Sequence, residues 1–194
     1  MTEEVQQQSQ PPKGLVLTFV GPIQPAATKN LRKACCMAIN QKAKKLTILF
    51  SSLGGSIDDG FALYGFLRAL PVELTIHAIG SVESIATVVF LAADKRLATP
   101  QAHFMIHGFT WPFVAQPYEQ RQIEDTQESL KHSLAKYTKV LEERTLLTQQ
   151  ALDQLNAFKK INILTPAFAK EKGIIQQIAD ATIPAGWITY NVDF

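Results

Sequence analysis

The sequence predicts a single domain of the α/β class, built on a layered and largely parallel β-sheet. Short apolar, β-branched runs of strand length alternate along the chain with longer segments whose apolar residues recur at helical spacing. The chain has 194 residues, of which 46% are hydrophobic and 19% charged, and this composition suits one globular core. No apolar run approaches the ~20 residues that a membrane-spanning helix needs.

The expected elements follow one another in alternation. Strands are expected at 14–21, 46–50, 72–79, 96–98, 104–107 and 162–164. Helices are expected at 25–44, 58–70, 85–93, 118–144, 149–158 and 166–172, with Thr165 as the N-cap of the last. The polar segment 1–13 is interpreted as a disordered leader, which leaves 14–194 as the domain.

Charge and cysteine content exclude several classes of function. The formal net charge is +2, and the longest basic cluster is Lys42–Lys45, so we expect no nucleic-acid partner and no membrane partner. The two cysteines, Cys35 and Cys36, are neighbours in a predicted helix, which disfavours a disulfide between them and favours a cytoplasmic protein. Neither dinucleotide nor P-loop glycine spacing is present, and we expect no cofactor and no metal.

Two loops stand where a parallel sheet usually carries its active site, after the carboxyl ends of strands. In SSLGGSIDDG, the pair Gly54–Gly55 suits either a tight turn or the close approach of backbone amides to a ligand. In GSVESIAT, Ser84 precedes an apolar helix. Ser84 is therefore either an N-cap, worth ~1 kcal/mol, or a nucleophile at a helix N-terminus.

A nucleophilic serine needs a base within hydrogen-bond reach. His107 closes the predicted strand FMIH and is the candidate, although a histidine at the end of an apolar strand is also a common structural residue. His103, two residues earlier, would share its face of the strand. His77 and His132 fall in the middle of a predicted strand and helix, away from loop ends.

In this order and spacing, the segments resemble the Clp protease proteolytic subunit family of serine peptidases, within the wider ClpP/crotonase-like fold. LTILFSSLGGSIDDGFALYGFL is similar to the family's strand, Pro-Gly-Gly-Ser loop and helix, with Leu53 in place of the proline. IGSVESIATVVFLAA is similar to its nucleophile loop, and AHFMIHG to the segment that ends in its catalytic histidine. ILTPAFAKEKGII is similar to a segment near its C-terminus.

The resemblance implies a fold of repeated β-β-α units and a reaction on peptide bonds. Ser84 would form an acyl-enzyme with His107 as base, and the N–H groups of Gly55 and Ile85 would form the oxyanion hole. The implied substrate is a peptide or unfolded protein. The implied partners are further copies of the chain and an AAA+ unfoldase.

Two segments depart from the family's pattern. The aspartate of its triad falls on Ile161 or Asn162, of which Asn162 could still orient His107 by a hydrogen bond, while Glu83 or Asp125 could substitute from elsewhere. After His107 the family has a glycine-rich strand, whereas this chain has the bulky GFTWPFVAQPYEQ, and we expect Trp111 and Phe113 to form a packing or oligomer contact.

These departures leave two alternatives to an active peptidase. One is a catalytically impaired homologue with a structural or regulatory role in a ring, which the missing aspartate favours. The other is another acyl-transfer activity of the crotonase-like fold, such as acyl-CoA chemistry. The presence of both Ser84 and His107 weighs against the second.

Overall fold

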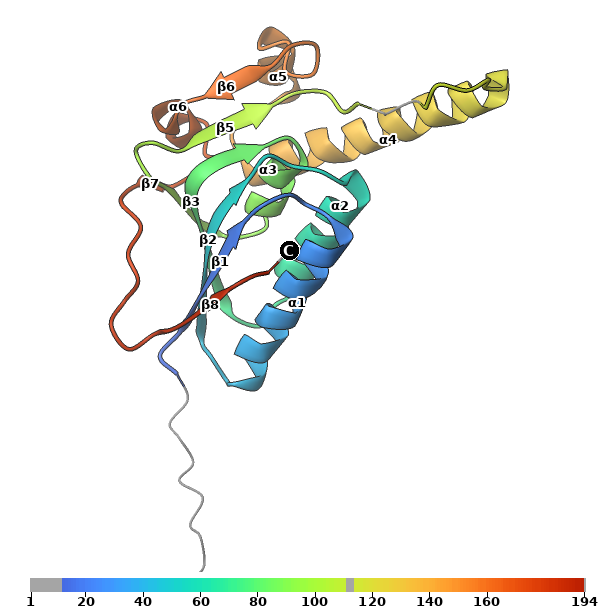
Figure 1. Ribbon diagram of the computed structural model, residues 1–194. Coiled ribbons are helices and arrows are strands. Elements are labelled where there is room, and N and C mark those ends of the chain that lie inside the picture. The colour runs from blue at the N-terminus through green and yellow to red at the C-terminus, as the bar shows by residue number, and fades with distance from the viewer. Residues whose placement is uncertain (1–11, 111–113, 194) are drawn as a thin grey trace, which may run out of the picture.

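The computed structural model describes residues 12–110 and 114–193. Most of the expected leader, and the residues Trp111 and Phe113 that we expected to form a contact, lie outside the described residues. The predicted α/β class is confirmed: a mainly parallel sheet carries helices beside it (Figure 1).

The sheet runs in the order β6-β5-β3-β2-β1-β8, with β4 pairing both β3 and β7. Every pairing is parallel except that of β5 with β6, which is antiparallel. The strands are β1 (Leu15–Val20), β2 (Lys45–Ser52), β3 (Glu73–Glu83), β4 (Lys95–Ala98), β5 (His103–Ile106), β6 (Asn162–Leu164), β7 (Gln177–Ile178) and β8 (Ile188–Asn191). The central strands supply much of the core: Leu15, Leu17 and Phe19 of β1 and Leu46, Ile48 and Phe50 of β2 are fully buried.

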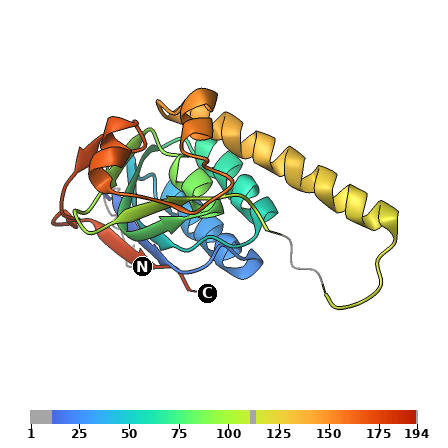
Figure 2. The same ribbon diagram turned by 90° about the horizontal axis from the view of Figure 1, so that it is seen from above.

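The helices are α1 (Pro25–Asn40), α2 (Ile57–Arg68), α3 (Ile85–Phe90), α4 (Gln120–Arg144), α5 (Gln149–Gln154) and α6 (Pro166–Glu171). α1 and α2 lie on the same face of the sheet (Figure 1). All six residues of α3 are buried, and the bare backbone of Gly60 in α2 lets that helix approach Ile85 at the start of α3. Part of α4 packs on the domain, while its N-terminal end projects beyond the sheet (Figure 2).

The most consequential difference from expectation concerns β3. The segment GSVES was expected to be a loop, but the strand continues to Glu83. Its first half, 75–78, pairs with β4, and its second half, 81–83, pairs with β5. The small and polar residues of this stretch remain extended because β5 supplies a new hydrogen-bonding partner where β4 ends.

Other differences lie at chain segments with weak apolar patterns. β7 and β8 were not expected, since β7 has only two residues and β8 is mostly polar and exposed. α4 begins at Gln120 rather than Tyr118, because Glu119 and Gln122 form a reciprocal capping box. The Thr165 cap is confirmed, since its hydroxyl accepts a hydrogen bond from the Phe168 N–H at 3.3 Å.

Candidate active site

Ser84 forms the sharp corner between β3 and α3. It occupies the N-cap position of α3, yet its side chain makes no capping hydrogen bond. Its backbone has φ 54° and ψ −131°, a conformation that a residue with a side chain rarely adopts and that costs of order 1–3 kcal/mol. The helix-cap interpretation therefore does not account for this serine. A serine at a strained strand-to-helix corner is also found in known nucleophile elbows, and Ser84 is half-buried at such a corner.

Main-chain hydrogen bonds hold this corner on both sides. The Ser84 N–H donates to the carbonyl of Met105 in β5 at 3.0 Å. The Ser84 carbonyl accepts from the N–H of Thr87 at 3.0 Å and from the Thr87 hydroxyl at 2.7 Å. The position of Ser84 is thus tied to the strand that leads to His107.

The Gly54–Gly55 loop packs directly against the serine. Both glycines have positive φ, 92° and 147°. A Cβ on Gly54 would lie 2.8 Å from the Cβ of Ser84, and a Cβ on Gly55 would lie 2.2 Å from the carbonyl oxygen of Ile23. Gly54 is required because a side chain there would collide with Ser84, and Gly55 because a side chain there would collide with the backbone of Ile23.

Two N–H groups near Ser84 suit an oxyanion. Gly54 and Ser56 both hydrogen-bond to the backbone of Ile23: the Gly54 carbonyl accepts from the Ile23 N–H, and the Ser56 N–H donates to the Ile23 carbonyl. The N–H of Gly55, between them, takes no part in this bridge. Ile85 is the first residue of α3, so its N–H has no partner within the helix, and the helix dipole favours negative charge there.

His107 follows the last residue of β5 and is half-buried. Its Nδ1 lies 2.6 Å from the carbonyl oxygen of Gly108. Because a carbonyl can only accept, Nδ1 is the protonated nitrogen of the neutral ring, which leaves the lone pair on Nε2. Within the described part of the chain, no hydrogen bond joins the imidazole to Ser84 Oγ or to Asn162.

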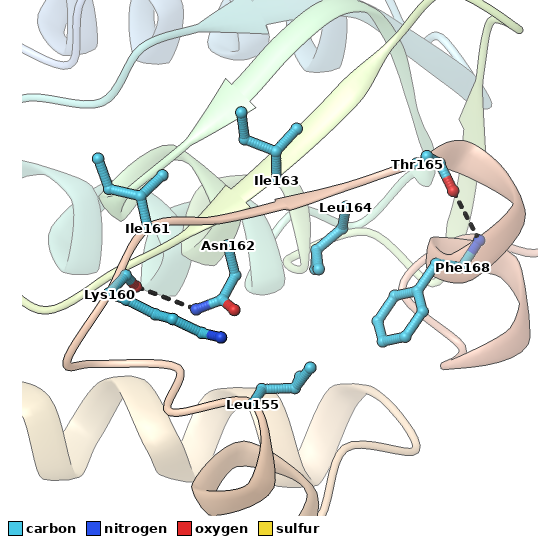
Figure 3. Close-up of a pocket in the computed structure, with 8 residues that line it drawn as sticks. All are labelled: Leu155, Lys160, Ile161, Asn162, Ile163, Leu164, Thr165 and Phe168. Carbon is cyan, nitrogen blue, oxygen red and sulfur yellow. Dashed lines mark hydrogen bonds between the residues drawn. The ribbon is translucent and has the colours of Figure 1, made fainter.

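The pairing register of β5 with β6 determines which side chains of β6 point to the same face of the sheet as His107. Ile106 pairs with Asn162 and Met105 pairs with Ile163. Figure 3 shows Asn162 pointing toward Leu155, on the side opposite to Ile161 and Ile163. The register, extended by one residue, would place Ile161 opposite His107.

Asn162 is engaged elsewhere. Its amide donates to the carbonyl of Lys160 at 3.0 Å and to that of Ala157 at 3.4 Å. It lines a surface pocket of ≈ 450 Å³ on its own side of β6 (Figure 3). Ile161, in contrast, is 65% exposed. Asn162 therefore pairs with β5 as a residue of β6, but the hydrogen bonds of its amide go to Ala157 and Lys160 instead of His107.

The two other carboxylates considered for the triad also have partners. Glu83 contacts His103 Nε2 at 3.0 Å, from the neighbouring strand β5. Asp125 lies on the exposed part of α4 and pairs with Arg121 at 3.7 Å. Glu83 and His103 lie on one face of the sheet because the β3–β5 register pairs Ser81 with His103 and Glu83 with Met105, a pairing that the sequence did not reveal.

A buried tyrosine was missed at the sequence level. Tyr137 of α4 is fully buried, and its hydroxyl lies 2.5 Å from the Thr87 hydroxyl and 3.4 Å from the Ser84 carbonyl oxygen. Its spacing from Leu130, Leu134 and Leu141 is typical of the apolar stripe of a helix and predicts only a core residue. No helix of the described residues could span a membrane, and no cluster of three or more potential metal ligands occurs among them.

A family model described as Clp protease matches residues 15–182 of the chain. The chain belongs to the Clp protease family. The matched range contains the β3–α3 corner, the glycine loop, His107 and β6, so the candidate site lies inside the region that defines membership.

Curated relatives agree with this assignment. The chain is similar to proteins named ATP-dependent Clp protease proteolytic subunit 1 from Chlamydia trachomatis serovar D and serovar A. Each is 31% identical over 84 residues, which cover 42% of this chain and 44% of the relative. The match thus spans less than half the length of these relatives.

Proposed function

We propose that this chain is a serine peptidase in which Ser84 is the nucleophile and His107 the general base. The observation that carries the proposal is the conformation of Ser84: φ 54° at a strand-to-helix corner, with no capping bond to explain it, beside a loop of two glycines. Membership of the Clp protease family supports peptide-bond hydrolysis as the reaction.

The proposed reaction proceeds through an acyl-enzyme. His107 Nε2 takes the proton of Ser84 Oγ as the oxygen attacks a peptide carbonyl, and the imidazolium then protonates the leaving amine. The N–H groups of Gly55 and Ile85 bind the developing oxyanion, and a water deacylates Ser84 with His107 again as base. Ser84 and His107 must approach within hydrogen-bond distance for this step, a contact that often tightens only when substrate is bound.

The third member of the site is proposed to be a backbone group. The carbonyl of Gly108 already accepts the Nδ1 proton of His107 and so selects the productive tautomer. Asn162 remains a prediction for this role, but its amide would have to leave the carbonyl of Lys160 and cross to the other side of β6. A carbonyl bears no full charge to stabilise an imidazolium, so we expect slow turnover.

The proposed setting follows from the family and the relatives' names. The substrates are peptides or unfolded proteins, and the active form is a homo-oligomer that works with an AAA+ unfoldase, in keeping with relatives named as ATP-dependent subunits. A cytoplasmic location is proposed because the neighbouring Cys35 and Cys36 are both free thiols.

One observation favours a second candidate function. Ile161, rather than a carboxylate, occupies the position that the register places opposite His107. A catalytically impaired chain that serves as a structural subunit of a ring would keep the fold but would need no carboxylate at this position. Acyl-CoA chemistry on the same fold gains no support from any contact described above.

Hydrolysis of short fluorogenic peptides tests the proposal. The wild-type chain is expected to cleave them slowly, and Ser84→Ala is expected to abolish cleavage while leaving the circular-dichroism spectrum unchanged. Cleavage that persists in Ser84→Ala would reject Ser84 as nucleophile. A folded wild-type chain without any cleavage would favour the structural subunit.

A further inference from the structure

Tyr137 of α4 lies beside the Ser84 corner through its hydroxyl and beside Phe109, two residues after His107, through its ring. The side chain is fully buried, and burial raises the pKa of its hydroxyl above the ordinary value, so the group keeps its proton. A buried hydroxyl must find acceptors, and those of Tyr137 lie at the β3–α3 corner.

The hydrogens in this cluster can be assigned from chemistry. The Ser84 carbonyl can only accept, so the Thr87 hydroxyl donates to it at 2.7 Å. With its hydrogen committed there, Thr87 Oγ1 accepts from the Tyr137 hydroxyl at 2.5 Å. The result is a chain from Tyr137 through Thr87 to Ser84, in which each hydrogen bond polarises and strengthens the next.

This chain acts on a strained residue. Ser84 has φ 54°, so its carbonyl orientation must be over-determined by its surroundings to persist. The Thr87 N–H and the Thr87 hydroxyl both donate to that carbonyl, and the Tyr137 hydroxyl, 3.4 Å from it, donates to Thr87 and so holds the Thr87 hydroxyl in place. Its direction also fixes the direction of the following N–H, that of Ile85, because the two belong to one peptide plane.

The ring of the same tyrosine supports the His107 segment. It stacks on the Phe109 ring, with the ring centroids 5.2 Å apart and the ring planes at 19°. The centroid of the Phe158 ring lies 5.8 Å from that of Tyr137. Phe109 is two residues after His107. Gly108 lies so close to Phe158 that an added Cβ would stand 2.5 Å from the Phe158 carbonyl oxygen. The Tyr137 ring thus packs against Phe109, the residue after Gly108, whose carbonyl accepts from His107 Nδ1.

We propose that Tyr137 is a positioning residue, whose hydroxyl sets the backbone of Ser84 through Thr87 while its ring sets the segment that carries His107. This inference rests on the proposed function, because it assigns the side chain that brings nucleophile and base into register. A tyrosine that merely filled the core would need its ring but not its hydroxyl, and this difference can be measured.

The test compares hydroxyl deletions by the rate at which a fluorophosphonate phosphonylates Ser84, with fluoride as the leaving group. Tyr137→Phe keeps the ring and Thr87→Val keeps the shape of its side chain, and each is expected to lower the limiting rate by about 10-fold or more without changing the half-saturating probe concentration. The double variant is expected to be no slower than the slower single variant, because the two hydroxyls act as one chain. Thr87→Ser, which retains the hydroxyl, is expected to restore the rate.

Tyr190→Phe is the matched control. It also removes a tyrosine hydroxyl and one hydrogen bond, from Gln41 at 3.1 Å, but on β8 at the far edge of the sheet. It is expected to react at the wild-type rate. A folded Tyr137→Phe that is also phosphonylated at the wild-type rate would overturn the inference.

A second readout separates this inference from the proposed function. If wild-type Ser84 is never phosphonylated, the proposed function fails, and amide hydrogen exchange of residues 84–87 then decides the inference. Faster exchange there in Tyr137→Phe than in Tyr190→Phe supports the positioning role. Equal exchange in the two variants rejects it.

Discussion

A Cβ atom on Gly54 would lie 2.8 Å from the Cβ of Ser84, closer than two such atoms approach in proteins. The two residues come from the ends of neighbouring parallel strands, β2 and β3, and their contact sets the shape of the candidate site. A turn alone would require a glycine for its φ of 92°, whereas this contact also requires the absence of a side chain.

Gly54→Ala is therefore expected to damage the site more than the fold. The added methyl group must displace Ser84, and we expect acylation of Ser84 to fall by about 100-fold. Positive φ for alanine should cost about 1–2 kcal/mol of unfolding free energy, measured in urea. Gly65→Ala is the control: no atom lies within 4 Å of its Cβ position in α2, so it should raise stability by about 0.5–1 kcal/mol and leave acylation unchanged. Equal acylation in both variants would contradict the packing argument.

Ile161→Asp is expected to increase activity. The β5–β6 register places this exposed position opposite His107, where a carboxylate could stabilise the imidazolium. Because removal of such a charge elsewhere has cost ~10⁴ in rate, we expect a gain of at least about 10-fold in kcat.

Ile163→Asp is the matched control for that gain. Ile163 is also exposed, at 66%, on the same side of β6, but it pairs with Met105. It should leave kcat unchanged. Asn162→Ala is likewise expected to leave kcat unchanged, because the Gly108 carbonyl holds His107. A loss of 10-fold or more in Asn162→Ala would restore Asn162 to the site.

Arg96 binds four backbone carbonyls from three segments of the chain and should contribute strongly to stability. The residue is 4% exposed, and its guanidinium donates to the carbonyls of Ala93, Arg144, Gly173 and Ile174. Burial lowers its pKa to about 10, so it remains charged at neutral pH. A lysine cannot reproduce this fork, and Arg96→Lys should cost about 3 kcal/mol in urea unfolding. Arg68→Lys, at a more exposed pair with Asp94, should cost less than about 1 kcal/mol.

His77 should make stability depend on pH. It is 5% exposed and donates from Nε2 to the carbonyl of Ala179, and burial lowers its pKa, against the opposing effects of that hydrogen bond and of Asp180. The unfolded chain therefore binds a proton more readily than the folded one. Stability should fall as pH drops below the ordinary histidine value of about 6.5 toward the folded pKa. His77→Gln should flatten this part of the profile, while exposed His132→Gln should not; equal slopes would contradict the account.

The strand and helix alternation was predictable wherever apolar periodicity was strong. β1, β2, α1, α2 and α6 appear within a few residues of their expected places, since a covered sheet demands apolar strands. The second half of β3 was not predictable, because Ser81 to Glu83 are extended only through pairing with β5. Local sequence carries no trace of that long-range partner.

Part of the candidate site could likewise be predicted from the sequence, and part of it could not. Ser84, His107 and the glycine loop follow strands and could be named from their positions at strand ends. The register that separates Asn162 from Ile161, and the contact of Tyr137 with Thr87, depend on how distant segments align. A helical apolar stripe marks Tyr137 as buried but does not say what its hydroxyl reaches.

The most direct test of the central claim is the site of fluorophosphonate labelling in the intact chain, read by peptide mass spectrometry. The account predicts one phosphonyl group on Ser84, none in Ser84→Ala, and labelling slowed by about 100-fold or more in His107→Ala. A folded wild-type chain that acquires no label, or one that acquires it on another residue, would contradict the account.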